Sequence, residues 1–310
     1  MRKKAILFAA VLCAVLLASC GASGPKASEL VSVEAGADGS YTGTVEILEN
    51  TAPGDVVYQR NGSMIDASNA SQGYVMVAQS GVTNRLKVQI AKEDVRYNYD
   101  LNNQGEWEAF PLQMGDGTYT IRIMQNKEDN LYFELFSAQI TVTLDSEFAP
   151  YLCPNQFVCY DSSSAVVRKS MDLCSNAQTD IEKLAVVYRW ITKNISYDTP
   201  KAESVQSGYL PEVDAILDSK KGICFDYASV MAAMLRAQGI PTKLVVGTVS
   251  ERDLNHAWNE VYLQNVGWVT VRIYFEGNQW QRMDPTFEAS GASFAKYIGD
   301  GSMYTSLKFY

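Results

Sequence analysis

Three residues in the C-terminal half of the chain could together form a nucleophilic site: Cys224, His256 and Asp284. A cysteine becomes a strong nucleophile when a neighbouring imidazole takes its proton. The imidazole in turn needs a carboxylate or an amide that fixes its tautomer and orientation. His256 is the only histidine in 310 residues, so no other imidazole could act as the base. The set predicts a cysteine nucleophile with a histidine base.

The residues after Cys224 predict the helix that would position it. Apolar residues recur at helical spacing from Phe225 to Leu235, and Gly239 followed by Pro241 predicts the helix end. Cys224 would therefore lie in the first helical turn. There the unpaired N–H groups and the helix dipole favour a thiolate over a thiol.

The base and the carboxylate are expected on strands. Residues 244–249 predict one strand, His256 begins a second, and Trp268 to Tyr274 predict a third. Asp284 lies near the end of another possible strand. Upstream, Thr179 to Glu182 form a capping box before a long amphipathic helix, and a short helix is expected from Glu212 to about Ser219.

Residues 41–144 have a different pattern. Short alternating segments are separated by turn signals such as Asn61-Gly62 and Asp116-Gly117. Several strands at this spacing predict a β-sandwich-like accessory domain over residues 41–148. The fold class expected for the whole chain is therefore α+β, with the sandwich followed by helices and an antiparallel sheet in a catalytic domain over residues 149–310.

Four short blocks follow one another in a known order: GICFDYA from Gly222, LRAQGIP from Leu235, HAWNEV from His256 and DPT from Asp284. Together they resemble the transglutaminase-like superfamily, in its bacterial and archaeal branch, over about residues 181–287. The resemblance implies a papain-like core in which Cys224 attacks an amide carbonyl and forms a thioester. It implies His256 as general base and acid, and Asp284 as the carboxylate that orients His256.

The sequence departs from animal transglutaminases after the nucleophile. Phe225 stands where those proteins carry Trp, and no run of acidic calcium ligands is evident. One histidine and the lack of a CxxC pair also argue against zinc. We therefore expect no metal and no cofactor. One disulfide among Cys153, Cys159 and Cys174 is left open.

The N-terminus carries the features of a targeting segment. A basic start is followed by an apolar run from Ala5 to Leu17, too short for a comfortable membrane span, and then by Leu17-Ala18-Ser19-Cys20. This ending resembles the bacterial lipobox. The resemblance implies a signal peptide over residues 1–19, cleavage before Cys20 and lipid on that cysteine. Residues 20–40 would form a flexible tether, so the protein is expected on the outer face of the cell membrane.

The net charge and the expected location outside the cell limit the possible binding partners. The net charge is -9, which disfavours nucleic acid as a partner. We expect a peptide or protein substrate at the cell surface or envelope, and a membrane contact through the lipid anchor. Hydrolysis of a peptide or isopeptide bond is the favoured reaction. The alternatives are crosslinking of glutamine to amines, and a non-catalytic protein of the same fold that binds peptide or envelope polymer.

Overall fold

A computed structural model describes residues 47–249, 254–264, 266–270, 273–275, 279–281 and 304–310. Across those ranges, every helix is too short or too polar to cross a lipid bilayer. The lipobox and Cys20 lie outside the described residues, so the predicted anchor stays a prediction. The domain boundaries predicted after residues 40 and 148 likewise stay predictions.

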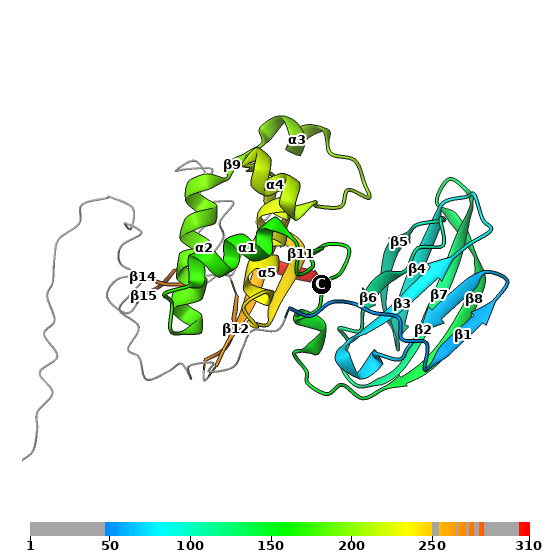
Figure 1. The fold of residues 1–310 in the computed structure, drawn as a ribbon. Coiled ribbons are helices and arrows are strands. Elements are labelled where there is room, and N and C mark those ends of the chain that lie inside the picture. The colour runs from blue at the N-terminus through cyan, green and yellow to red at the C-terminus, as the bar shows by residue number, and fades with distance from the viewer. Residues whose placement is uncertain (1–46, 250–253, 265, 271–272, 276–278, 282–303) are drawn as a thin grey trace, which may run out of the picture.

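The first half of the described chain forms two four-stranded antiparallel sheets that face each other (Figure 1). Ile65 and Phe110 of one sheet and Val88 and Ile121 of the other belong to a single buried cluster. One sheet has the order β1-β2-β3-β6, with β1 Val57–Arg60, β2 Ser63–Asp66, β3 Tyr74–Gln79 and β6 Glu108–Pro111. The other has the order β5-β4-β7-β8, with β5 Val95–Leu101, β4 Leu86–Lys92, β7 Gly117–Glu128 and β8 Leu131–Val142.

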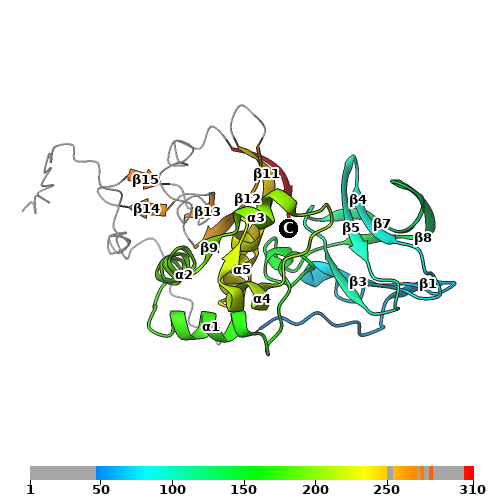
Figure 2. The ribbon, with the colours of Figure 1, turned by 90° about the horizontal axis from the view of Figure 1, so that it is seen from above.

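The second half packs helices against one face of a four-stranded antiparallel sheet of order β13-β12-β11-β16 (Figure 2). The strands are β11 Thr242–Val249, β12 Leu254–Leu263, β13 Gly267–Thr270 and β16 Tyr304–Phe309. The helices are α1 Ala165–Cys174, α2 Asp180–Asn194, α3 Thr199–Ser204, α4 Val213–Ser219 and α5 Cys224–Arg236. Helix α5 is buried between α1, α2 and α4 on one side and the sheet on the other. The predicted α+β class is confirmed.

The local signals of the sequence account for the main helices. The capping box of α2 forms as predicted, because Thr179 accepts from the Glu182 N–H and Glu182 accepts from the Thr179 N–H. Helix α5 begins at Cys224 and ends before Gly239, whose φ of 74° lies in the left-handed region that ends helices.

Two parts of the second half differ from the sequence prediction. The expected single strand from Trp268 to Tyr274 is two strands, since β13 pairs with β12 whereas β14, Ile273–Phe275, pairs with β15, Gln279–Gln281. The C-terminal tail supplies an unpredicted strand, β16, which pairs with β11. Short segments of this kind are poorly specified by their own residues, since pairing depends on a partner far along the chain.

The two halves share an aromatic cluster. Tyr310, which follows β16, packs edge-on against Tyr97 and Tyr99 of the sandwich, with ring centroids 5.6 and 5.9 Å away. The ring of Phe157, from the connection between the halves, lies 4.4 Å from that of Tyr310. Tyr310 thereby joins β16 to the second sandwich sheet, so the two halves contact each other through this cluster.

A glycine of the sandwich also meets the connection between the halves. Gly73 has a φ of 90°, and a Cβ there would lie 2.5 Å from the Pro150 backbone nitrogen. Gly81 has a similar φ of 74°, but a Cβ there would meet nothing within 4 Å. A side chain would strain the backbone at both glycines, but it would meet crowding only at Gly73. Comparing the two positions therefore separates the effect of strain from that of crowding.

Gly73→Ala should therefore destabilise the protein by about 1–3 kcal/mol more than Gly81→Ala, because the crowded atom is backbone and cannot turn away. Urea unfolding of both variants measures the difference. Equal losses of unfolding free energy would show that the Gly73 contact with the connection contributes nothing.

Candidate functional site

Cys224 is the first residue of α5 and is half-buried. The chain enters the helix through Ile223, whose φ of -96° and ψ of 177° are extended. Just before it, β10, Lys221–Gly222, pairs in parallel with β9, Ser196–Tyr197. The backbone before Cys224 is thus held by a neighbouring strand, and the backbone after it is held by the helix. Both fix the position of Cys224.

A buried carboxylate two residues after Cys224 holds the start of α5. The Asp226 side chain is fully buried and accepts a hydrogen bond of 2.8 Å from the Ile223 N–H. The Lys201 ammonium donates to one oxygen at 2.6 Å, and the Tyr209 hydroxyl donates to the other, also at 2.6 Å. A buried charge is tolerated when it is paired and hydrogen-bonded in this way.

The geometry explains the neighbouring residues of the GICFDYA block. A Cβ at Gly222 would lie 2.6 Å from the Asp226 Cβ, so this position requires a residue without a side chain. The Tyr227 hydroxyl donates to the Ile195 carbonyl at 2.6 Å, which ties α5 to the end of α2. The block therefore builds a rigid helix start around the cysteine.

His256 lies in β12, opposite Gly247 of β11, and is 6% exposed. Its ring stacks on Trp258, with centroids 6.2 Å apart and planes at 21°. A Cβ at Gly247 would lie 2.0 Å from the Thr305 carbonyl oxygen of β16 and 2.6 Å from the Trp258 ring, so the glycine lets both the neighbouring strand and the indole approach β11 closely. Stacking of this kind restricts the orientation of the imidazole.

Helix α5 is tied to the strand that carries His256. The Asn259 side-chain amide, three residues after His256, donates to the Ala228 carbonyl of α5 at 3.0 Å and to the Lys243 carbonyl of β11 at 3.2 Å. The fold thus packs the elements that carry Cys224 and His256 against each other. Asp284 lies outside the described residues, so its role stays a prediction.

The other described cysteines are free thiols, and no disulfide joins any pair among Cys153, Cys159, Cys174 and Cys224. Burial raises the pKa of the Cys153 thiol to about 11, against the opposing effect of the Arg236 charge. Burial also raises the pKa of Cys174 to about 11. Both therefore remain thiols near neutral pH. Cys159 is exposed.

Lys201 and Tyr209 are parts of the site that the sequence did not indicate. Both lie in a segment without hydrophobic periodicity, between β9 and α4. Asp226 is part of the GICFDYA block, and the structure shows that it holds the start of α5. Among the described residues, no group of three or more His, Cys, Asp and Glu side chains could hold a metal ion.

Comparison with known proteins places the region that contains Cys224 and His256 within one superfamily model. Residues 168–285 match the model of the transglutaminase-like superfamily. Kyphoscoliosis peptidase of Homo sapiens is 30% identical over 103 residues, which cover 30% of this chain and 15% of that protein. Protein-glutamine gamma-glutamyltransferase of Pseudomonas aeruginosa is 29% identical over 103 residues, 29% of this chain and 15% of that protein. The matched region thus spans about 15% of the length of these relatives.

Solved structures of related proteins give only a distant likeness. The periplasmic domain of TgpA from Pseudomonas aeruginosa has a TM-score of 0.33 and 16% identity, and the match covers 76% of this chain and 73% of that one. Red sea bream transglutaminase has a TM-score of 0.27 and 16% identity, with 69% and 48% covered.

Proposed function

We propose that this chain, whose residues 168–285 are a transglutaminase-like core, is a cysteine enzyme that cleaves peptide or isopeptide amide bonds through a thioester on Cys224. One observation carries the proposal. Cys224 begins a buried helix whose start is held by the Asp226 network, and that helix is packed on the strand that carries His256. A purely structural cysteine would need neither arrangement.

In the proposed reaction, the Cys224 sulfur forms a bond to the amide carbonyl carbon, and the carbon–nitrogen bond breaks. His256 takes the thiol proton and passes it to the leaving amine. The Cys224 backbone N–H is a natural donor to the oxyanion. Water then attacks the thioester, the carbon–sulfur bond breaks, and the thiol is restored. Asp284 would hold the imidazole in the required tautomer.

We further propose that the enzyme works outside the cell, anchored to the membrane through lipid on Cys20, on a peptide or protein of the cell surface or envelope. Water is in excess there unless an acceptor amine is bound, which favours hydrolysis. Transfer of a glutamine acyl group to an amine is the second candidate. The similarity to a protein named as a gamma-glutamyltransferase supports it.

Alkylation of Cys224 tests the nucleophile and its base. With Cys13, Cys20 and Cys159 replaced by Ser, the thiols that remain besides Cys224 are Cys153 and Cys174. Both are buried with a raised pKa, so iodoacetamide should label Cys224 selectively. We expect the Cys224 rate near neutral pH to exceed that of a model thiol by about tenfold or more. His256→Gln should reduce it by about tenfold or more, because the thiolate loses its imidazolium partner.

A mass-spectrometric assignment of the labelled residue completes this test. A Cys224 rate equal to that of the model thiol, unchanged in His256→Gln, would leave a binding protein of the same fold as the better account. Incubation with a peptide and labelled cadaverine then separates the two reactions, because amine incorporation without cleavage would indicate transfer.

A further inference from the structure

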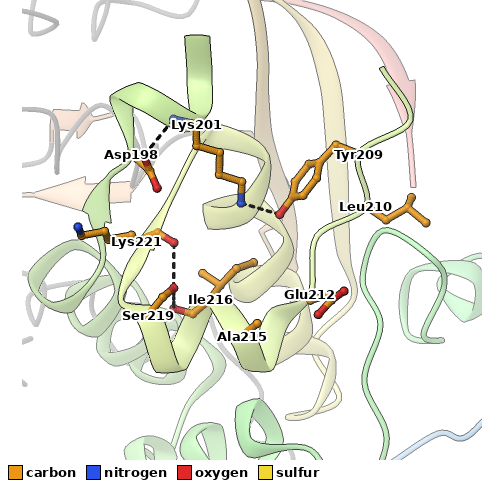
Figure 3. Close-up of a pocket in the computed structure, with 9 residues that line it drawn as sticks. All are labelled: Asp198, Lys201, Tyr209, Leu210, Glu212, Ala215, Ile216, Ser219 and Lys221. Atoms are coloured by element: carbon orange, nitrogen blue, oxygen red, sulfur yellow. Dashed lines mark hydrogen bonds between the residues drawn. The ribbon is translucent and has the colours of Figure 1, made fainter. Parts of the chain in front are cut away.

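A cavity of about 330 Å³ lies beside the Asp226 network (Figure 3). Lys201 of α3 and Tyr209 of the following loop form one side of it. Leu210, Ala215 and Ile216 give it an apolar part, and Glu212 lies at its edge. A volume of a few hundred Å³ with an apolar wall and a few polar groups is typical of a site for a small ligand or one side chain.

The charges that face the cavity leave a negative excess. The Lys201 ammonium is already paired with Asp226 at 2.6 Å, so this pair is neutral. The Asp198 carboxylate accepts from the Lys201 N–H as the cap of α3. Lys221 contributes its main chain, since its ammonium points away from the other lining residues (Figure 3).

Glu212 carries the charge that is available to a ligand. It is exposed and precedes α4, yet its side chain makes no capping hydrogen bond. Within the described residues it also forms no ion pair. A carboxylate next to the apolar surface of Leu210, Ala215 and Ile216 fits a guest that has an apolar stem and a terminal ammonium.

The cavity lies close to the nucleophile. Lys221, which lines it, is three residues before Cys224, and three residues span at most about 11 Å. The ring of Tyr209 lies 6.5 Å from that of Phe225, the residue directly after Cys224. A peptide whose amide reaches Cys224 could therefore place a neighbouring side chain in the cavity.

We propose that this cavity is a substrate subsite that accepts a lysine-like side chain, with its ammonium at Glu212 and its stem on Leu210, Ala215 and Ile216. The assignment of the guest as part of a substrate rests on the proposed function. The binding itself does not, because no step of it involves the thiol.

Binding to the Cys224→Ser protein tests the subsite without catalysis. The probes are N-acetyl-lysine amide, N-acetyl-norleucine amide and N-acetyl-glutamate amide, titrated by NMR at low salt. The lysine probe should bind about three- to fivefold more tightly than the norleucine probe, because an exposed ion pair contributes modestly. Glu212→Gln should remove that difference, and Glu212→Lys should give the preference to the glutamate probe.

Glu203→Gln is the matched control, since Glu203 is an exposed residue of α3 outside the cavity lining, and it should leave the preference unchanged. The proposal is wrong if the protein with Glu212 intact binds the lysine and norleucine probes equally, or binds the glutamate probe most tightly. It is also wrong if Glu212→Gln keeps the preference for the lysine probe. If the protein prefers the lysine probe but Cys224 is unreactive in the alkylation test, the cavity is a lysine-binding site and the proposed enzymatic function is wrong.

Discussion

Arg236→Met should lower the free energy of unfolding by about 3–5 kcal/mol, because it removes three hydrogen bonds and takes the Arg236 donor away from the buried carbonyls of Thr242 and Cys153. Arg236 is 2% exposed, at the end of α5. Its guanidinium donates to the carbonyl oxygens of Thr242 at 2.9 Å, Cys153 at 2.6 Å and Tyr310 at 2.8 Å. These acceptors belong to β11, to the connection between the halves and to the residue after β16.

Burial lowers the pKa of Arg236, since desolvation disfavours the charged form, but arginine stays protonated in proteins. Three charge-assisted hydrogen bonds to main-chain oxygens stabilise the buried guanidinium. Methionine keeps much of the apolar part of the arginine side chain and removes every donor. The loss of unfolding free energy therefore reports on the hydrogen bonds.

Urea unfolding followed by circular dichroism measures this prediction. Arg96→Met is the control, because Arg96 is exposed in β5, and it should change the free energy of unfolding by no more than about 0.5 kcal/mol. Arg236→Lys should recover only part of the stability, since an ammonium cannot reach three acceptors in the geometry of a planar guanidinium. Similar losses in Arg236→Met and Arg96→Met would contradict the role assigned to Arg236.

Asp226→Ala should also destabilise the protein by about 3–5 kcal/mol, since it leaves the Lys201 charge, the Tyr209 hydroxyl and the Ile223 N–H without their acceptor. It should also slow alkylation of Cys224, because the first turn of α5 would lose its cap. Labelling at a urea concentration well below the unfolding transition separates this local effect from global unfolding.

A double variant distinguishes loss of a charge pair from loss of packing. Asp226→Ala with Lys201→Met should be less destabilised than the sum of the two single variants, because the second change removes the unpaired ammonium. Asp172→Ala, at an exposed position of α1, is the control and should have little effect. Strict additivity of the Asp226 and Lys201 variants would show that the two side chains do not interact.

Much of the second half could be predicted from local residue patterns. Helix α5 follows from apolar residues at helical spacing after Cys224 and from Gly239 beyond its end, and the start of α2 follows from the Thr179–Glu182 capping box. Strands such as β4, β7 and β11 follow from runs of apolar and alternating residues. These features depend on residues a few positions apart, so the sequence alone was sufficient to specify them.

The partners of Asp226 and Arg236 could not be predicted in this way. Lys201 is 25 residues from Asp226 along the chain, in a segment without periodicity. The acceptors of Arg236 are main-chain carbonyls, which every residue carries and which therefore leave no mark in a sequence. Local spacing thus placed Cys224 at a helix start. The long-range packing of loops and strands determined which charges are buried around that helix, because such contacts depend on the path of the whole chain.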